Sequence, residues 1–252
     1  MTTNKNIYKF DKSLTEGVIK YRKRQFVLFC DVAGEEQRCH CPCTGRIGHI
    51  DISQRPCLLS KSSDSKRKTP YTVEAISLNK ITDKNKSWIG INQTASNRYI
   101  EYFLKQNALK EMIDCEGKDI LREQLLGDSK LDFLVDNTYI EIKTPMHYLD
   151  LEIPDYIKLV KHSDFSSTDR MMKHVKQLQK SLKNHQRAIL LTVFTYDAPI
   201  FHIKDEWKST KFDSVSQTVF RSINSGVEYW QANLIFSKTG VKLDKYLKLK
   251  LY

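Results

Sequence analysis

One stretch, residues 129–143, constrains this chain most strongly because it predicts both a local fold and a local arrangement of charge. Two short runs flank Asp136-Asn137, and each run alternates apolar with polar residues. Asp and Asn tolerate the positive φ of a two-residue hairpin turn, so the stretch predicts a β-hairpin. Alternate residues of each strand share a face with the residues opposite them on the other strand, and we expect the apolar face to be buried. That face carries Leu131, Phe133, Val135, Ile140 and Ile142.

The other face of the predicted hairpin collects charge. With the turn at Asp136-Asn137, Asp132 lies directly opposite Glu141, and in the same register Lys130 lies opposite Lys143. Opposed Cβ atoms are roughly 4.5–5.5 Å apart, so the two carboxylates repel unless positive charge compensates them. Lys143 supplies some of that charge, and a divalent metal ion would supply more. The pattern D…E-x-K on a hairpin matches the core of the PD-(D/E)xK nuclease superfamily; the alternative is a surface hairpin with a solvated charged face.

The overall charge indicates an anionic partner. The net charge is +11 over 252 residues, and nucleic acid is the first candidate. The alternative is a basic protein that binds no polyanion. No apolar run approaches the roughly 20 residues of a membrane span, and the N-terminus lacks the apolar core of a signal peptide. We therefore expect a cytoplasmic protein with no membrane partner, and a homo-oligomer is compatible with the sequence.

The cysteines at 39, 41 and 43 raise the question of a zinc site. A C-x-C-x-C run on a strand places its three thiols on one face, and no second C-x-x-C or H-x-x-x-H pair completes a tetrahedron. We expect reduced thiols in a reducing compartment, with zinc as the alternative.

Residues from about 14 to 82 are β-rich. Strand candidates separated by turn signals lie at residues 25–32, 38–42, 56–60 and 71–76. Several short strands without a helical period suggest a small barrel. Basic residues cluster at Arg22-Lys23-Arg24 and Lys66-Arg67-Lys68. They either form a groove for a phosphate backbone or are solvated loop side chains.

The polar run 82–87 marks a boundary, so we divide the chain into residues 1–83 and 84–252. The second region predicts a helix from about Ala95, the hairpin, and a helix from Ser167 or Thr168 to about Leu182. A buried strand at 188–194, a helix ending at Gly226, a strand at 227–236 and an edge strand at 245–251 follow. This alternation predicts an α/β arrangement, a mixed sheet flanked by helices.

The helix predicted at 168–182 has one apolar stripe, with polar side chains beside it. The stripe is formed by Met171, Val175, Leu178 and Leu182, and Arg170, Lys173, His174 and Gln177 flank it. If the helix packs beside the hairpin, some flanking side chains can reach a phosphate bound there. A single histidine beside an apolar stripe is usually structural, and a catalytic base is the alternative for His174.

Several motifs along the chain match those of one family in the same order. In the first region they are Tyr21-Arg22-Lys23-Arg24-Gln25-Phe26, His40 to Arg46, and Lys66 to Tyr71. In the second region they are Ile89 to Asn92, Asn97-Arg98, Glu123 to Phe133, Glu141-Ile142-Lys143, Arg170 to Leu178, and Gly226-Val227-Glu228. On these residues the chain resembles the sugar fermentation stimulation protein (SfsA) family. The chain departs from the family pattern at Cys43, Gln93, Ser96, Lys130, Met171 and Gln177 and in the shorter segment before Arg170, and these departures leave the D…E-x-K residues intact.

The resemblance implies an OB-like β-barrel followed by a restriction-endonuclease-like PD-(D/E)xK domain. It also implies binding of DNA or RNA and metal-dependent hydrolysis of phosphodiester bonds. The expected catalytic residues are Asp132, Glu141 and Lys143. Asp132 and Glu141 are expected to hold Mg²⁺ or Mn²⁺, with Glu123 as a further ligand, directly or through water. The expected nucleic-acid-binding residues are Arg22, Lys23, Arg24, Arg46, Arg67, Lys68, Arg98, Lys130, Arg170, Lys173 and His174.

Two other functions share most of these features. A non-catalytic DNA-binding regulatory protein on a nuclease scaffold would have the same basic residues and need no metal. A structural or interaction protein with a basic surface would leave the two opposed carboxylates unexplained.

Overall fold

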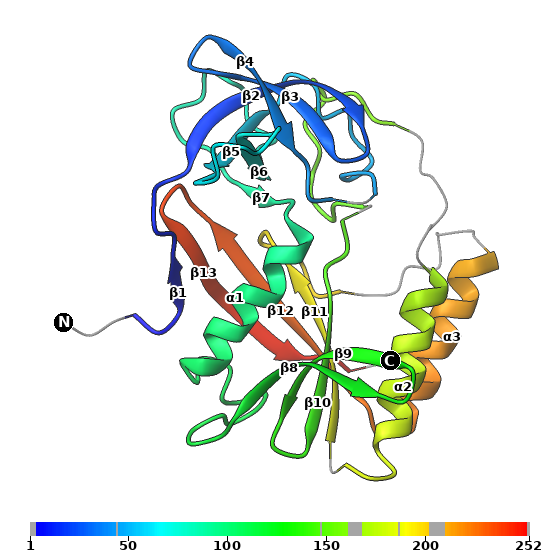
Figure 1. Ribbon diagram of the computed structural model, residues 1–252. Helices are drawn as coiled ribbons and strands as arrows, with labels where there is room; N and C mark the ends of the chain where they lie inside the picture. The colour runs from blue at the N-terminus through cyan, green and yellow to red at the C-terminus, as the bar shows by residue number, and fades with distance from the viewer. Residues whose placement is uncertain are drawn as a thin grey trace.

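The computed structural model describes residues 4–43, 45–146, 148–160, 168–185, 187–201 and 210–250. These residues form two β-sheets, one closed into a small barrel and one open and flanked by helices (Figure 1). This architecture confirms the predicted α/β fold, an OB-like barrel followed by a mixed sheet with helices on it. None of the helices in these ranges has the length and apolar character needed to cross a bilayer.

Within the described residues, five strands close the barrel. They are β2 (Thr15–Arg24), β3 (Val27–Val32), β4 (Glu35–His40), β5 (Pro56–Lys61) and β6 (Tyr71–Ile76). Neighbours pair in the order β4-β3-β2-β5-β6, and a parallel pairing of β4 with β6 closes the ring. A short strand, β7 (Ile89–Gly90), adds to β6 and leads out of the barrel. The predicted boundary at residue 83 falls between β6 and β7.

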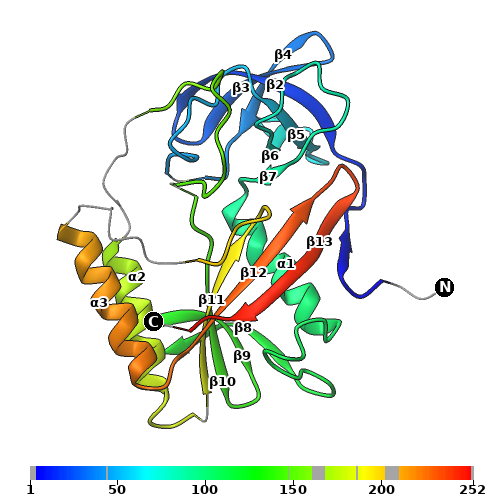
Figure 2. The same ribbon diagram turned by 180° about the vertical axis from the view of Figure 1, so that it is seen from behind.

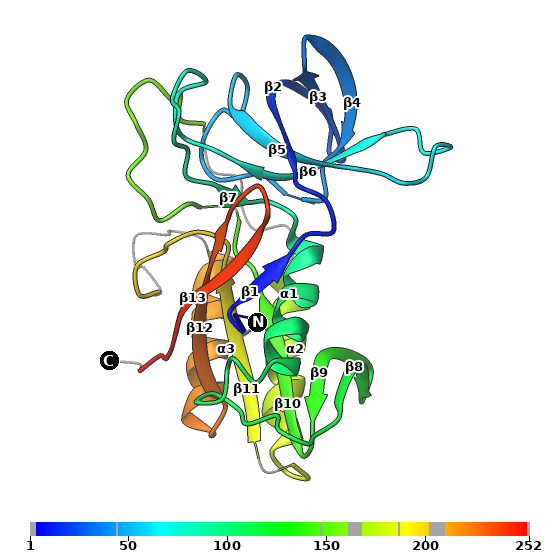
Figure 3. The same ribbon diagram turned by 90° about the vertical axis from the view of Figure 1, so that its left-hand side faces the viewer.

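The open sheet contains seven strands in the described part of the chain. From one edge to the other they are β1 (Ile7–Lys9), β13 (Gly240–Lys248), β12 (Glu228–Phe236), β11 (Arg187–Phe194), β10 (Thr138–Lys143), β9 (Ser129–Val135) and β8 (Ile120–Leu126). The central strands β10, β11 and β12 are parallel, and the outer pairings are antiparallel. The sheet is therefore mixed, and β1 belongs to it although β1 precedes the barrel in the chain (Figure 3).

The described residues also form the helices α1 (Gln93–Lys105), α2 (Thr168–Ser181) and α3 (Thr210–Asn224). α1 covers one face of the sheet, and its Tyr99 and Phe103 belong to the same buried cluster as strand residues of β9 to β13. α2 and α3 lie together on the other face, where Val175 and Val219 join a second cluster (Figure 2). The apolar stripes predicted for these helices therefore provide the contacts that hold them on the sheet.

α1 begins at a side-chain cap that comes from the barrel side. The Asn92 side chain accepts the backbone N–H of Ala95, which satisfies one of the unpaired donors at the helix start. Asn92 also donates its amide to Glu74 Oε2 at 2.7 Å, and Ser60 Oγ donates to Glu74 Oε1 at 2.6 Å. Glu74 is a buried carboxylate on β6. The barrel thus fixes the first turn of the helix.

β9 and β10 form the predicted hairpin. Asp136 has a φ of 52°, and the pairing register is the predicted one as far as Ile140 opposite Phe133, where the ladder stops. The predicted apolar face is buried, but the prediction that its five residues share one side is wrong for Leu131. Leu131 packs in the cluster under α2, whereas Phe133 packs in the cluster under α1. β9 still pairs with β8 at this point but no longer with β10, so the hairpin register from which the shared face was predicted does not extend to Leu131.

The edge strand predicted at 245–251 is confirmed in part: residues 245–248 pair only with β12 among the described residues, whereas residues 240–242 of the same strand also pair with β1. β13 pairs with β12 on one side and with β1 on the other. β1 is three residues long, too short for a periodic pattern to reveal it in the sequence. Lys245 and Lys248 are exposed on β13.

All six cysteines are free thiols and are buried. Cys30, Cys39, Cys41, Cys43 and Cys57 lie in one cluster in the barrel core, and Cys115 lies in the cluster under α1. Within the described ranges, no three Cys, His, Asp or Glu side chains take a metal-binding arrangement. The thiols fill space as small apolar groups do.

Candidate functional site

The carboxylate of Asp132 lies on β9, where the strand separates from β10. Its Oδ2 accepts the backbone N–H of Ile142 at 2.7 Å, and its Oδ1 accepts the side-chain amide of Asn97 at 2.7 Å. Just beyond the last β9–β10 backbone pair, the Asp132 side chain therefore takes the place of a backbone carbonyl as the acceptor for Ile142. Both oxygens are held, so this carboxylate has a fixed orientation between the hairpin and α1.

The carboxylate of Glu141 is the most buried acid of the site, with 2 % of its side chain exposed. Its Oε1 lies 2.5 Å from His174 Nδ1 and also accepts the Lys143 amine. Its Oε2 is buried and has no hydrogen-bond partner among the described residues. Burial of an ionised oxygen without a partner is costly, so this atom is suited to face a cation.

The pKa values of the two carboxylates are shifted in opposite directions. Burial raises the pKa of Asp132, and the nearby negative charge of Glu141 raises it further, against the Ile142, Lys143 and Asn97 interactions that lower it. Burial also acts to raise the pKa of Glu141, but the His174 and Lys143 interactions outweigh it and hold that pKa below its ordinary value. Two acids close enough to oppose each other's ionisation are the arrangement that the sequence predicted.

The site lies at the carboxyl end of β10, beside the parallel strand β11. Ligand sites of α/β sheets commonly lie at the carboxyl ends of parallel strands. Lys143 follows Glu141 by two residues and keeps a quarter of its side chain exposed. Its amine therefore reaches from the buried carboxylate toward solvent.

Glu123 is not part of this group. It has a φ of 50° and interrupts the β8–β9 ladder between the pairs that Arg122 and Gln124 make. Its side chain is 67 % exposed and lies 4.0 Å from the Lys130 amine. The structure therefore brings Asp132, Glu141 and Lys143 together and leaves Glu123 and Lys130 at the surface, where they form an ion pair.

Two neighbours of the carboxylates were not predicted in these roles. Asn97 belongs to a motif noted in the sequence, but no role followed from it, because its contact with Asp132 spans 35 positions. His174 was predicted to contact nucleic acid; in the structure it is 12 % exposed and lies on Glu141. The sequence signal for this contact was the position of His174 beside the apolar stripe of the helix, next to Val175.

The predicted basic residues of the barrel divide into two groups. Arg22 donates to the backbone carbonyls of Gln25, Cys43 and Gly45, so its guanidinium is engaged in holding the following loop. The others lie at or near the surface: Lys23, Arg24, Arg46 and Lys68 are exposed, and Arg67 is half-buried. Arg98, at the start of α1, lies over the rings of Tyr8 and Tyr99.

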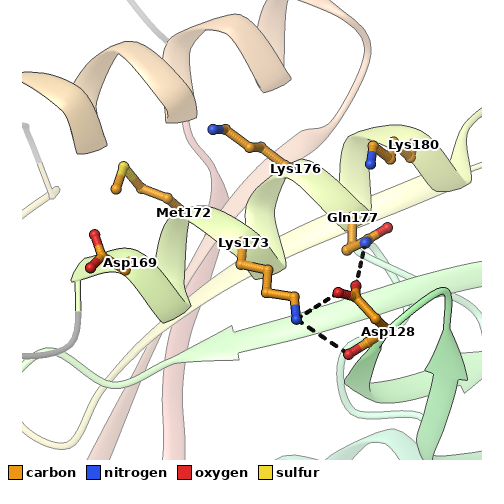
Figure 4. Close-up of a pocket in the computed structure, with 7 residues that line it drawn as sticks. All are labelled: Asp128, Asp169, Met172, Lys173, Lys176, Gln177 and Lys180. Carbon is orange, nitrogen blue, oxygen red and sulfur yellow. Dashed lines mark hydrogen bonds and ion pairs between the residues drawn. The ribbon is translucent and has the colours of Figure 1, made fainter.

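The outer side of α2 carries further positive charge. Arg170 and Lys173 are exposed there. Lys173 pairs with the Asp128 carboxylate at 2.8 Å, and the Gln177 amide donates to the same carboxylate. Figure 4 shows Lys173, Gln177 and Asp128 with Lys176 and Lys180 along an open groove beside the β8–β9 turn. The groove borders the helix turn that holds His174.

Comparison with known proteins agrees with this architecture. The SfsA N-terminal OB domain model matches residues 20–91, and the sugar fermentation stimulation protein RE domain model matches residues 94–240. A sugar fermentation stimulation protein homolog from Prochlorococcus marinus is 28 % identical over 264 residues, covering 98 % of this chain and 100 % of its own. A homolog from Natranaerobius thermophilus is 27 % identical over 206 residues, covering 77 % and 78 %.

The same fold occurs in a solved structure, that of SfsA from Pyrococcus furiosus in complex with Ca²⁺. It superposes with a TM-score of 0.72 at 18 % identity and covers 97 % of this chain and 98 % of its own. The two domain models together span both the barrel and the open sheet. The chain belongs to the sugar fermentation stimulation protein (SfsA) family.

Proposed function

We propose that this protein binds nucleic acid and is a metal-dependent nuclease that hydrolyses phosphodiester bonds, with a PD-(D/E)xK-type site at the β9–β10 hairpin. The observation that carries the proposal is the buried Oε2 of Glu141, which lies beside Asp132 and has no hydrogen-bond partner in the described part of the chain. A structural hairpin gains nothing from two acids that raise each other's cost of ionisation. A site for a divalent cation requires them.

The residues present fit such an ion. Asp132 and Glu141 would hold Mg²⁺ or Mn²⁺, and because no third acid joins them in the described residues, water and substrate oxygens would complete the shell. A bound ion would supply a Lewis acid that neutralises charge on the reacting phosphate and acidifies water. The solved SfsA structure from Pyrococcus furiosus is a complex with Ca²⁺, which supports divalent-ion binding by this chain.

The protein's own side chains would prepare the reaction around this ion. Asn97 and the Ile142 N–H hold Asp132 in one orientation, which limits the reorganisation needed when charge develops. Lys143, partly exposed beside Glu141, is placed to orient the attacking water or to stabilise the developing negative charge. His174 lies on Glu141 and fixes that carboxylate from the α2 side.

The nucleic-acid part of the proposal rests on surface charge. The exposed basic side chains of the barrel and of α2 contact a phosphate backbone without reading its sequence. Basic side chains that neutralise phosphates release the counterions of the nucleic acid. This release becomes less favourable at higher salt, so the affinity should fall steeply as the salt concentration increases.

The second candidate is a DNA-binding regulatory protein that uses the nuclease scaffold without turnover. The ion pair between Lys143 and Glu141 favours it, because a lysine that is neutralised by the acid gives the site charge balance without a metal. The proposed nuclease differs from it in needing the metal for function.

The experiment incubates labelled DNA and RNA with the protein in Mg²⁺, Mn²⁺ or EDTA. We expect metal-dependent cleavage by wild type, loss of cleavage in Asp132→Ala and Lys143→Ala, and retained binding by both variants at low salt. Lys118→Ala is the matched control, because Lys118 pairs with Asp136 at the tip of the same hairpin. Equal cleavage by Asp132→Ala and wild type rejects the site; binding without cleavage in any metal supports the regulatory protein.

A further inference from the structure

The outer face of the β2–β3–β4 sheet exposes aromatic rings. Tyr21 and Phe26 are each 44 % exposed, although large apolar side chains are usually covered. Tyr21 lies opposite Phe29 in the β2–β3 register, and the two rings stack at 4.8 Å with an angle of 13° between their planes. A stacked pair on a barrel surface leaves a flat π face open to solvent.

A second ring pair lies farther along the same face. Phe26 stacks with His40 at 6.3 Å and 25°. His40 pairs with Val27, two residues from Phe29, so both ring pairs are on one side of the sheet. Burial lowers the pKa of His40, and the charge of Arg67 lowers it further, which favours the neutral ring.

Two β-bulges in β2 explain why the Tyr21 ring points outward. The β2–β3 register shifts between Ile19 and Tyr21 and again between Arg22 and Arg24. Ile19 is fully buried, and without the first bulge Tyr21 would follow it into the core. The inner face is already filled by residues such as Leu28 and Cys30, so the outer rings do not complete the core.

Positive charge surrounds the rings. Lys23 Nζ lies 5.9 Å from the centre of the Phe29 ring. Arg38 is exposed and lies opposite Phe29 in the β3–β4 register, and Arg24 is exposed and lies opposite Val27. The acidic residues of this sheet lie at its other end, near the β3–β4 turn, where Glu36 pairs with Lys20. Aromatic faces and cations therefore coincide at one end of the sheet.

We propose that this face binds single-stranded DNA, with unpaired bases stacked on the Tyr21–Phe29 and Phe26–His40 pairs and the phosphates beside Lys23, Arg24 and Arg38. Base faces are covered in a duplex and open in a single strand, so exposed rings select the single strand. Ribose selection needs polar groups directed at the 2′-hydroxyl, and the charged groups beside the rings are donors suited to phosphate. The inference rests on the nucleic-acid-binding part of the proposed function and adds its substrate class.

The test measures fluorescence anisotropy of a labelled oligothymidylate of about 12 nucleotides in EDTA, where no metal-dependent cleavage occurs. A strand of equal length made of abasic sites provides the same phosphates without bases. We expect wild type to bind the thymidylate strand roughly tenfold or more tightly than the abasic strand. Tyr21→Leu/Phe26→Leu should lose this preference, because leucine keeps apolar volume and removes the ring.

Phe220→Leu is the matched control, because Phe220 is an exposed ring, 38 % exposed, on α3. It should leave the preference unchanged, and Tyr21→Trp/Phe26→Trp should retain it. Equal affinity of wild type for both strands overturns the inference without any variant. So does an unchanged preference in the leucine pair, or a clear preference for oligouridylate over oligothymidylate. Absence of wild-type binding to either strand would instead overturn the nucleic-acid part of the proposed function.

Discussion

A divalent ion should stabilise the folded chain through Asp132 and Glu141, and this can be measured without any substrate. Glu141 Oε2 is buried without a hydrogen-bond partner among the described residues, and burial together with the charge of Glu141 raises the pKa of Asp132. An ion that binds only the folded state at about 100 times its Kd adds about 2.7 kcal/mol to the free energy of unfolding. For a chain of this size, each kcal/mol raises Tm by about 2–4 °C, so the expected rise is about 5–10 °C.

The assay is scanning calorimetry of EDTA-treated protein, titrated with Mg²⁺, Mn²⁺ or Ca²⁺ at constant ionic strength. Asp132→Asn keeps the side-chain shape and removes the anion, so its metal-dependent rise should fall below about 2 °C. Its Tm in EDTA should stay close to that of wild type, because two effects offset each other. Asparagine loses one of the two oxygens that accept hydrogen bonds from Ile142 and Asn97, and it also loses the repulsion between the charges of Asp132 and Glu141. A rise in Asp132→Asn equal to that of wild type would refute the reasoning.

Glu123→Gln separates the predicted ligand set from the one that the structure brings together. Glu123 is exposed and pairs with Lys130, so its loss should leave the metal-dependent rise in Tm intact. Loss of the rise in this variant would show that Glu123 reaches the ion after all, as the sequence predicted.

Three further predictions concern one hydrogen bond of the site, one ion-pair cluster and one tightly packed glycine. Asn97→Ala removes a hydrogen bond to a charged, partly buried group, worth about 1.5–3 kcal/mol, and should lower metal-dependent cleavage at least about tenfold while binding in EDTA persists. The pKa of Glu228 is lowered to about 2, because hydrogen bonds from three side chains outweigh the effect of burial. Glu228→Gln should therefore lower the free energy of unfolding, measured in urea at neutral pH, by about 1–2 kcal/mol. The difference from wild type should fade as the pH falls from about 4.5 toward 2. Gly90→Ala places a Cβ 2.5 Å from the Phe236 ring, so calorimetry should show a Tm lower by several degrees, corresponding to about 1–3 kcal/mol of overpacking.

Much of the fold was predictable, because its elements carry strong local patterns. The hairpin turn at Asp136 and the buried strand β11 follow from residue types and periods that act within a few positions. The failures occur where the backbone departs from regular geometry. Glu123 adopts a left-handed conformation in the middle of β8. Leu131 packs on the α2 side of the sheet, beyond the end of the β9–β10 ladder. Neither departure has a signature in the local sequence.

The site was predictable only as far as the hairpin extends. Asp132, Glu141 and Lys143 lie within twelve positions, and strand alternation relates them. Asn97 and His174 reach the carboxylates across 35 and 33 positions, from helices on opposite faces of the sheet, and only packing determines those contacts. The outward ring of Tyr21 on β2 could not be predicted for a different reason: a bulge reverses the alternation on which the prediction depends.

The barrel and the carboxylates are connected through α1, so the two regions are not independent modules. Glu74 on β6 accepts the amide of Asn92, and Asn92 caps the helix whose Asn97 holds Asp132. A helix start fixed by a side-chain cap has little freedom to rotate or shift, and Asn97 lies little more than one turn beyond it. The orientation of Asp132 therefore depends on a buried carboxylate of the barrel. The barrel and the hairpin are therefore joined through Glu74, Asn92 and the first turns of α1, so a change at Glu74 should be felt at Asp132.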